Sequence, residues 1–139
     1  MAIKNYTTSV SAFQSIGEIQ GALAEHGAER IIVDYKDKKP LGISFLIETK
    51  MGLQGFTLPA CVDGTLRVFA KQKVKQSREQ AEKTAWRNIR DWVLAQVAIV
   101  ESCDIPMEEP FLPYLTDRNG KTLFEAFQSG QLLLPEVGE

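Results

Sequence analysis

The stretch that decides the fold is RIIVDYKDKKPLGISFLIETKMGLQGFTL, residues 30–58. It holds three runs rich in β-branched, aromatic and aliphatic side chains, separated by short segments with turn-forming residues. Because short turns join antiparallel neighbours, this pattern predicts an antiparallel meander. In the middle run Ile43, Phe45 and Ile47 occupy alternate positions, so we expect this set to face the core. The three expected strands cover residues 30–35, 41–49 and 53–58.

Helical periodicity comes before and after this meander. Residues 9–26 place apolar side chains at three- and four-residue steps, with Ser9 or Ser11 as the cap and Gly27 as the stop. The apolar positions of this helix are Val10, Phe13, Ile16, Ile19 and Leu23. After the meander, the helical period returns at Thr65 as a short helix.

A long amphipathic helix follows, and its second half is unusually apolar. We expect it to begin after the capping residue Ser77 and to end near Cys103. Its segment WVLAQVAIV, residues 92–100, is apolar nearly all round, which is typical of a helix buried on several sides. A chain of 139 residues has few ways to surround one helix, so this segment predicts self-association as a dimer or a larger homo-oligomer.

The fold class that these elements predict is α+β. It consists of the N-terminal helix, a three- to four-stranded antiparallel sheet, the long amphipathic helix and a C-terminal arm interrupted by prolines. Residues 1–105 form the single domain of this prediction. The arm, residues 106–139, would pack on the domain or on a partner subunit, and residues 121–127 form its last short helix.

The formal net charge is only −2, but the charge is strongly segregated along the chain. Residues 67–90 carry eight basic and two acidic side chains, whereas residues 91–139 carry two basic and nine acidic ones. The longest apolar stretch, Val93–Val100, is far shorter than the roughly 20 residues needed to span a bilayer. With no apolar leader at the N-terminus, we expect a cytoplasmic protein without a membrane partner.

The residues that usually carry catalysis are scarce. His26 is the only histidine and precedes Gly27 at a helix end, where an imidazolium interacts well with the helix dipole. Cys61 and Cys103 stand far apart without a CxxC spacing, so the chain cannot build a structural zinc site from them. We therefore expect a non-enzymatic protein without metal or cofactor, with thiols that are buried or idle in a reducing compartment.

The most informative pattern is a basic stripe on the long helix. Lys83, Arg87 and Arg90 lie within about 60° of one another on an ideal helix. One interpretation is a solvated face with (i, i+4) pairs such as Arg87–Asp91. The other is a phosphate site, in which arginine binds in bidentate fashion and lysines upstream supply the field.

Several segments of the chain resemble a family of small, functionally unassigned proteins found in bacteriophage and prophage genomes. These segments are KNYTTSVSA (4–12), SIGEIQGALAEHGAERIIVDY (15–35), GFTLPACVDG (55–64), SREQAEKTAWRNIRDWVLAQVAIVES (77–102), EEPFLPYL (108–115) and GKTLFEAF (120–127). The chain has Pro106 before Met107, where the family tends to have glycine or another small residue. The resemblance implies work inside an infected bacterial cell, and it carries over no catalytic residues.

The leading hypothesis from the sequence is a phage accessory protein that binds a small phosphorylated nucleotide, for example to sequester a host immune signal. One alternative is a DNA- or RNA-binding accessory of phage replication or recombination, and another is a protein-binding inhibitor of a host enzyme. In the nucleotide hypothesis, arginines and lysines engage phosphate and an aromatic ring takes the base. The candidate ligand-binding residues are Lys71, Lys73, Lys83, Trp86, Arg87, Arg90, Phe111 and Tyr114.

Overall fold

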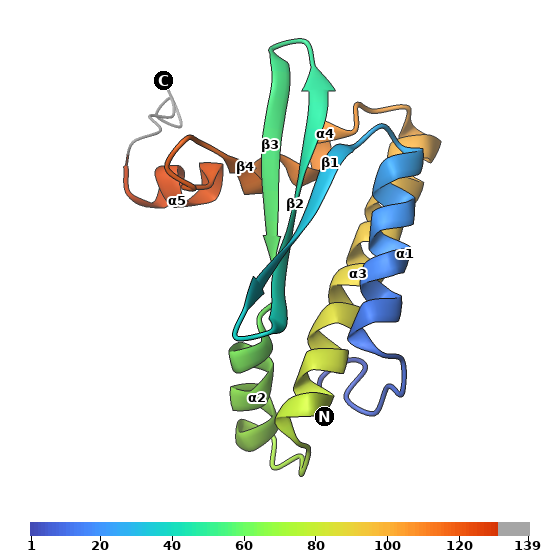
Figure 1. Ribbon diagram of the computed structural model, residues 1–139, viewed down its shortest axis with the longest axis vertical. Coiled ribbons are helices and arrows are strands. Elements are labelled where there is room, and N and C mark those ends of the chain that lie inside the picture. The colour runs from blue at the N-terminus through green and yellow to red at the C-terminus, as the bar shows by residue number, and fades with distance from the viewer. Residues whose placement is uncertain (131–139) are drawn as a thin grey trace, which may run out of the picture.

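The computed structural model describes residues 1–130 and has the expected α+β architecture (Figure 1). Three strands lie between two long helices in the chain, and a short arm follows. The elements are α1 (Ala12–Glu25), β1 (Glu29–Lys36), β2 (Lys39–Thr49), β3 (Gly52–Pro59), α2 (Val62–Lys71), α3 (Arg78–Cys103), α4 (Glu108–Phe111), a 3₁₀ turn η1 (Leu112–Tyr114), β4 (Leu115–Thr116) and α5 (Leu123–Gln128). The last nine residues of the predicted arm, 131–139, lie outside the described part.

The meander is confirmed as a fully antiparallel sheet of order β1-β2-β3-β4. Ile43, Phe45 and Ile47 are all buried, as the alternation predicted. A two-residue turn, Asp37-Lys38, joins β1 to β2, and both of its residues have positive φ values of 50° and 66°. Such turns match the right-handed twist of paired strands, so this hairpin is tight and well defined.

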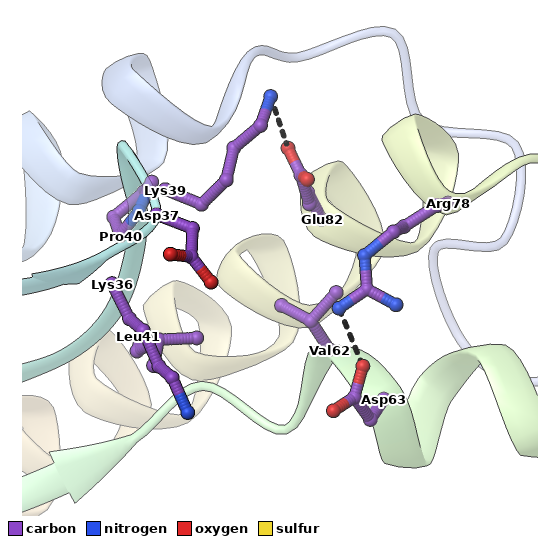
Figure 2. Close-up of a pocket in the computed structure, with 9 residues that line it drawn as sticks. All are labelled: Lys36, Asp37, Lys39, Pro40, Leu41, Val62, Asp63, Arg78 and Glu82. Atoms are coloured by element: carbon purple, nitrogen blue, oxygen red, sulfur yellow. Dashed lines mark hydrogen bonds and ion pairs between the residues drawn. The ribbon is translucent and has the colours of Figure 1, made fainter.

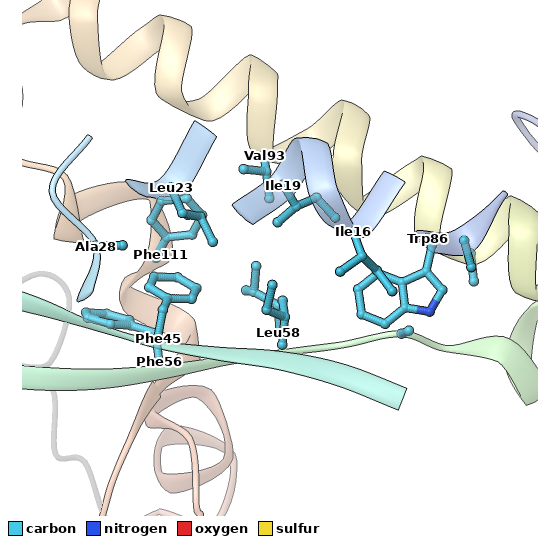
Figure 3. Close-up of a cluster of buried hydrophobic side chains, with 14 of the residues drawn as sticks. Ile16, Ile19, Leu23, Ala28, Phe45, Phe56, Leu58, Trp86, Val93 and Phe111 are labelled. Carbon is cyan, nitrogen blue, oxygen red and sulfur yellow. The ribbon is translucent and has the colours of Figure 1, made fainter. Parts of the chain in front are cut away.

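Both long helices pack on the same face of the sheet. Side chains of α1, among them Ile16, Ile19 and Leu23, lie between α3 and the sheet, where Phe45 is part of the layer beneath them (Figure 3). Trp86 of α3 is fully buried in the same core. The core is therefore a single cluster shared by helices and sheet.

The start and end of α1 follow from its sequence. The Ser11 hydroxyl accepts a hydrogen bond from the Gln14 backbone N–H, which confirms the cap, and Gly27 follows the helix with φ of 96°. His26 is the C-cap residue, as its place beside Gly27 suggested. Two of the predicted apolar positions differ. Phe13 is 64% exposed rather than in the core, and Val10 precedes the cap because the helix begins at Ala12 rather than at residue 9.

The second helical region begins at Val62 rather than at Thr65, because Asp63 and Gly64 belong to the first turn of α2. Thr65 lies inside that helix and donates a hydrogen bond to the Cys61 carbonyl. The long helix agrees with its prediction, and the Ser77 hydroxyl accepts from the Gln80 N–H at its start. At 26 residues, α3 extends about 39 Å and spans the whole domain.

The first part of the C-terminal arm is built into the domain. Phe111 is completely buried and makes edge-to-face contacts with Phe45 and Trp92, with ring centroids 5.5 Å apart in each case. Strand β4 then pairs with β3, with Leu115 opposite Phe56. The arm thus completes both the core and the sheet. The capping box of Thr122 and Glu125 starts α5 two residues later than predicted.

We predict that Phe111→Ala destabilises the whole domain, because the cavity would open beneath both the sheet and α3. The expected loss is about 3–5 kcal/mol in the free energy of unfolding, measured by urea denaturation. Phe124→Ala is the control, since Phe124 is 54% exposed on α5 and its removal should cost no more than about 0.5 kcal/mol. Equal losses for the two variants would show that the arm is not part of the core.

Candidate nucleic-acid interface

One end of the molecule collects cationic side chains from three elements that are distant in the sequence. These elements are the β1–β2 hairpin, the segment that ends α2 and leads into α3, and the first turns of α3 (Figure 1). We call this region the basic end. Nine cationic side chains and four carboxylates belong to it. The cations are Lys36, Lys38, Lys39, Arg67, Lys71, Lys73, Lys75, Arg78 and Lys83, and the carboxylates are Asp37, Asp63, Glu79 and Glu82.

A pocket of about 290 Å³ lies between the hairpin, α2 and the start of α3 (Figure 2). Lys39 approaches Glu82 across it at 3.7 Å, and Arg78 is ion-paired with Asp63. A small phosphate entering this pocket would compete with carboxylates for these cations. The pocket therefore carries nearly equal positive and negative charge, whereas the exposed lysines around it are not balanced by carboxylates.

A second hollow of about 380 Å³ lies on the other side of Lys39, between the N-terminal ends of α1 and α3. Lys39, Arg78 and Lys83 contribute its cations, Glu79 and Glu82 its carboxylates, and Phe13 an exposed ring. Both helix N-termini add positive partial charge here, because the backbone dipoles of a helix sum toward that end. The hollow thus combines cations, helix dipoles and an aromatic surface.

The two arginines of the predicted stripe do not face this region but bind α1. Arg90 Nε donates to Glu18 Oε1 at 2.8 Å, and Arg87 Nη1 donates to Glu18 Oε2 at 3.2 Å. Their side chains are only 25% and 18% exposed. Partial burial opposes ionisation of Glu18, yet hydrogen bonds from Gln14, Arg90 and Arg87 outweigh it and lower its pKa. The two arginines of the stripe are thus neither solvated nor open to phosphate, because they clamp two helices together, whereas Lys83 of the same stripe lines the second hollow.

The sequence suggested an (i, i+4) pair between Arg87 and Asp91, but in the structure the Asp91 carboxylate has other partners. It accepts from Asn5 at 2.9 Å and from Arg90 at 3.0 Å, and Lys4 lies 3.2 Å away. Desolvation opposes ionisation, but the hydrogen bonds from Asn5, Arg90 and Lys4 prevail and lower the pKa of Asp91. The N-terminal segment is thereby attached to α3.

The aromatic members of the predicted site are dispersed. Trp86 is fully buried and its indole N–H donates to the Pro40 carbonyl at 3.3 Å, so it presents no face to a ligand. Phe111 is equally buried, and Tyr114 is half-buried against Trp92. Lys71 and Lys73 are exposed at the basic end and Lys83 lines its second hollow. The structure therefore brings together the lysines of the predicted set but separates them from its rings.

The hairpin lysines and Phe13 were missed by the sequence reasoning. The sequence signal for the lysines is the run KDKK, residues 36–39, whose two middle residues form the turn between β1 and β2. It was hidden because the first half of the chain has nearly balanced charge. Phe13 fits the apolar period of α1, so its exposure becomes visible only when the helix is placed on the sheet.

The opposite end of the molecule is acidic. It comprises the C-terminal ends of α1 and α3, the start of β1, the β2–β3 turn and α4 (Figure 1). Its carboxylates are Glu25, Glu29, Glu48, Glu101, Asp104, Glu108 and Glu109. His26 joins the two helices there by donating to the Ala22 carbonyl and contacting the Glu101 carboxylate. Only the imidazolium can donate at both nitrogens, so these bonds raise the pKa of His26.

Comparison with protein-family models, curated proteins and solved structures finds no match to this chain. Among residues 1–130, no helix is long and apolar enough to cross a membrane, and no three His, Cys, Asp or Glu side chains are grouped to hold a metal. Cys61 and Cys103 are free, and both are exposed rather than buried. The geometry of the basic end therefore carries the functional argument.

We predict that Arg87→Ala weakens folding without weakening anion binding, since the arginine binds Glu18 and does not reach the basic end. The melting temperature should fall by roughly 2–4 °C, measured by differential scanning fluorimetry. Glu18→Gln should act in the same direction at pH 7. Because folding lowers the pKa of Glu18, the stabilisation that its carboxylate gives to the fold is present above pH 4.5. This stabilisation is lost as the pH falls through the lowered value. A loss of anion affinity in Arg87→Ala would contradict this assignment.

We also predict that His26 makes stability depend on pH near neutrality. A raised pKa in the folded state means that the stabilisation is complete below pH 6.5 and is lost as the pH rises through the raised value. Urea denaturation at a series of pH values should show this decline in the parent protein and a flatter profile in His26→Gln. Glu101→Gln should shrink the decline, and identical profiles in all three proteins would exclude the role of His26.

Proposed function

We propose that this protein is a non-enzymatic nucleic-acid-binding protein that holds the phosphate backbone at its basic end. The observation that carries the proposal is the convergence of nine cations from three elements on one end of the domain. Within residues 1–130 most of these cations are exposed, and only Lys39 and Arg78 form ion pairs. A strand bound there would release counterions from its backbone, which is the main source of affinity for such ligands.

The distribution of charge favours a polyanion over a small phosphorylated ligand. A mononucleotide would occupy one hollow and meet the carboxylates that line it, such as Asp63 and Glu82. A strand crossing the end of the domain would instead reach lysines of the hairpin and of the segment after α2. The acidic side chains that would repel a long polyanion are gathered at the far end of α1 and α3.

The position of Phe13 favours a single strand. Its ring is exposed beside Lys39 and Lys83, and base stacking on an aromatic ring among cations is typical of single-strand binding. In a duplex the bases are stacked on one another, so no free base face is available to this ring. We therefore expect tighter binding of single-stranded than of double-stranded oligonucleotides, with little sequence preference.

The proposal is tested by fluorescence anisotropy with a labelled 20-nucleotide single strand, the matching duplex and a labelled mononucleotide, each at several salt concentrations. Lys38→Gln/Lys71→Gln should weaken single-strand binding and reduce the slope of log K against log salt by about 1.4. Arg30→Gln/Lys50→Gln, at the acidic end, is the matched control and should change neither quantity.

Phe13 provides a separate test of the stacking contact. Phe13→Ala should weaken single-strand binding by about fivefold or more, since stacking on one base is worth about 1–3 kcal/mol. Phe124→Ala removes a similarly exposed ring from α5 and should have no effect.

A salt slope unaffected by the double lysine variant would refute the proposal. Saturable uptake of one mononucleotide without strand binding would support the nucleotide hypothesis instead.

A further inference from the structure

The outer face of α3 is covered over only part of its length. The N-terminal segment, residues 1–10, lies along its first half, where the Asn5 carbonyl accepts from the Thr84 hydroxyl at 2.9 Å. The Asn5 side chain donates to Asn88 at 2.8 Å and reaches Asp91, the last of these contacts along the helix. This segment thus covers α3 up to Asp91 and no farther.

Beyond Asp91 the same helix face continues without a cover in the described chain. Its residues follow the helical spacing i, i+3, i+4 and i+7, and all four are exposed: Ala95, Ala98, Ile99 and Ser102. We call them the bare face. Ile99 is 44% exposed, whereas Val93 and Val97 of the same segment point into the core. No charged residue occurs between Asp91 and Glu101.

We propose that a second copy of this chain covers the bare face, with the two α3 helices packed antiparallel about a twofold axis near Ala98. The charges at the two ends of the face favour this direction. Lys4 is held at one end beside Asp91, while Asp104 stands at the other, where Glu101 already contacts His26 of its own chain. An antiparallel pair places Lys4 of each copy near Asp104 of the other, whereas a parallel pair would bring like charges together.

The side chains of the bare face suit close helix packing. Ala95 and Ala98 have short side chains, so two helices can approach to the lower part of the usual 8–10 Å interaxial range. Ile99 then supplies the apolar bulk on either side of the axis. Because the face pairs with itself, the assembly closes as a dimer and leaves no free copy of the surface.

The dimer is independent of the proposed function, because the basic end lies far from the bare face. Arg78 is 20 residues from Ala98 along α3, which corresponds to about 30 Å on a straight helix. The two basic ends of the dimer would therefore point away from each other, roughly 60 Å apart. Each could bind its own strand, so loss of one property does not remove the other.

Sedimentation-equilibrium measurements on the full chain at about 1–100 µM test the proposal. The parent protein should be dimeric at the upper end of this range, and Ala98→Glu should be monomeric with an unchanged circular dichroism spectrum. Ala70→Glu alters another exposed helical alanine, on α2, and should remain dimeric. A parent protein that is monomeric at 100 µM, or a dimer that survives Ala98→Glu, would overturn the proposal.

Two further variants test the direction of the helices. Lys4→Glu should raise the dissociation constant of the dimer about tenfold, and adding Asp104→Lys should restore it, because the pair of charges is then exchanged. In a Cys61→Ser/Cys103→Ser background, Ala98→Cys should oxidise to a covalent dimer, since the two residues meet at the axis. Ala70→Cys in that background should not. Failure of both the charge exchange and the cross-link would overturn the antiparallel arrangement.

Discussion

The odd number of strands between the two long helices is the constraint on which the rest of the structure depends. Because neighbouring strands alternate in direction, β3 runs opposite to α1 and ends on the side of the sheet where α1 begins. The chain reverses once more between α2 and α3 (Figure 1). Helices α1 and α3 must therefore lie parallel on the sheet, with both N-termini at one end. Parallel helix dipoles repel each other, and the ion pairs from Glu18 to Arg87 and Arg90 offset that cost in the middle of the contact.

This topology converts charge segregation along the chain into charge separation in space. The basic block begins near the end of α2 and continues into the first half of α3, so it lies at the same end as the β1–β2 hairpin. Because α3 is about 39 Å long, its acidic C-terminal part is carried to the opposite end. A protein with a net charge of −2 can in this way present a cationic surface to a polyanion.

Prediction from sequence succeeded where a local signal matched the tertiary environment. The serine caps of α1 and α3 depend on hydrogen bonds within one helical turn. The alternation of buried side chains in β2 depends on the two-residue period of a strand. Prediction failed where a distant residue supplied the partner. Glu18 lies 69 residues from Arg87, and no helical projection of α3 alone could reveal that contact. Phe13 was misplaced for the same reason, since its exposure depends on how α1 sits on the sheet.

The sequence by itself determined the long helices, the three strands of the meander, their order and the α+β class, because hydrophobic period, caps and turns act over a few residues. It did not reveal α4 and β4 in the arm. It also determined that the positive charge is concentrated in one part of the chain. Only the tertiary structure decided which cations are free and which are used to hold helices together. It likewise decided that the rings of Trp86 and Phe111 belong to the core, while the lysines at residues 36–39 join the basic end. The physical reason is that pairing and burial depend on contacts between distant segments, and those exist only once the chain is folded.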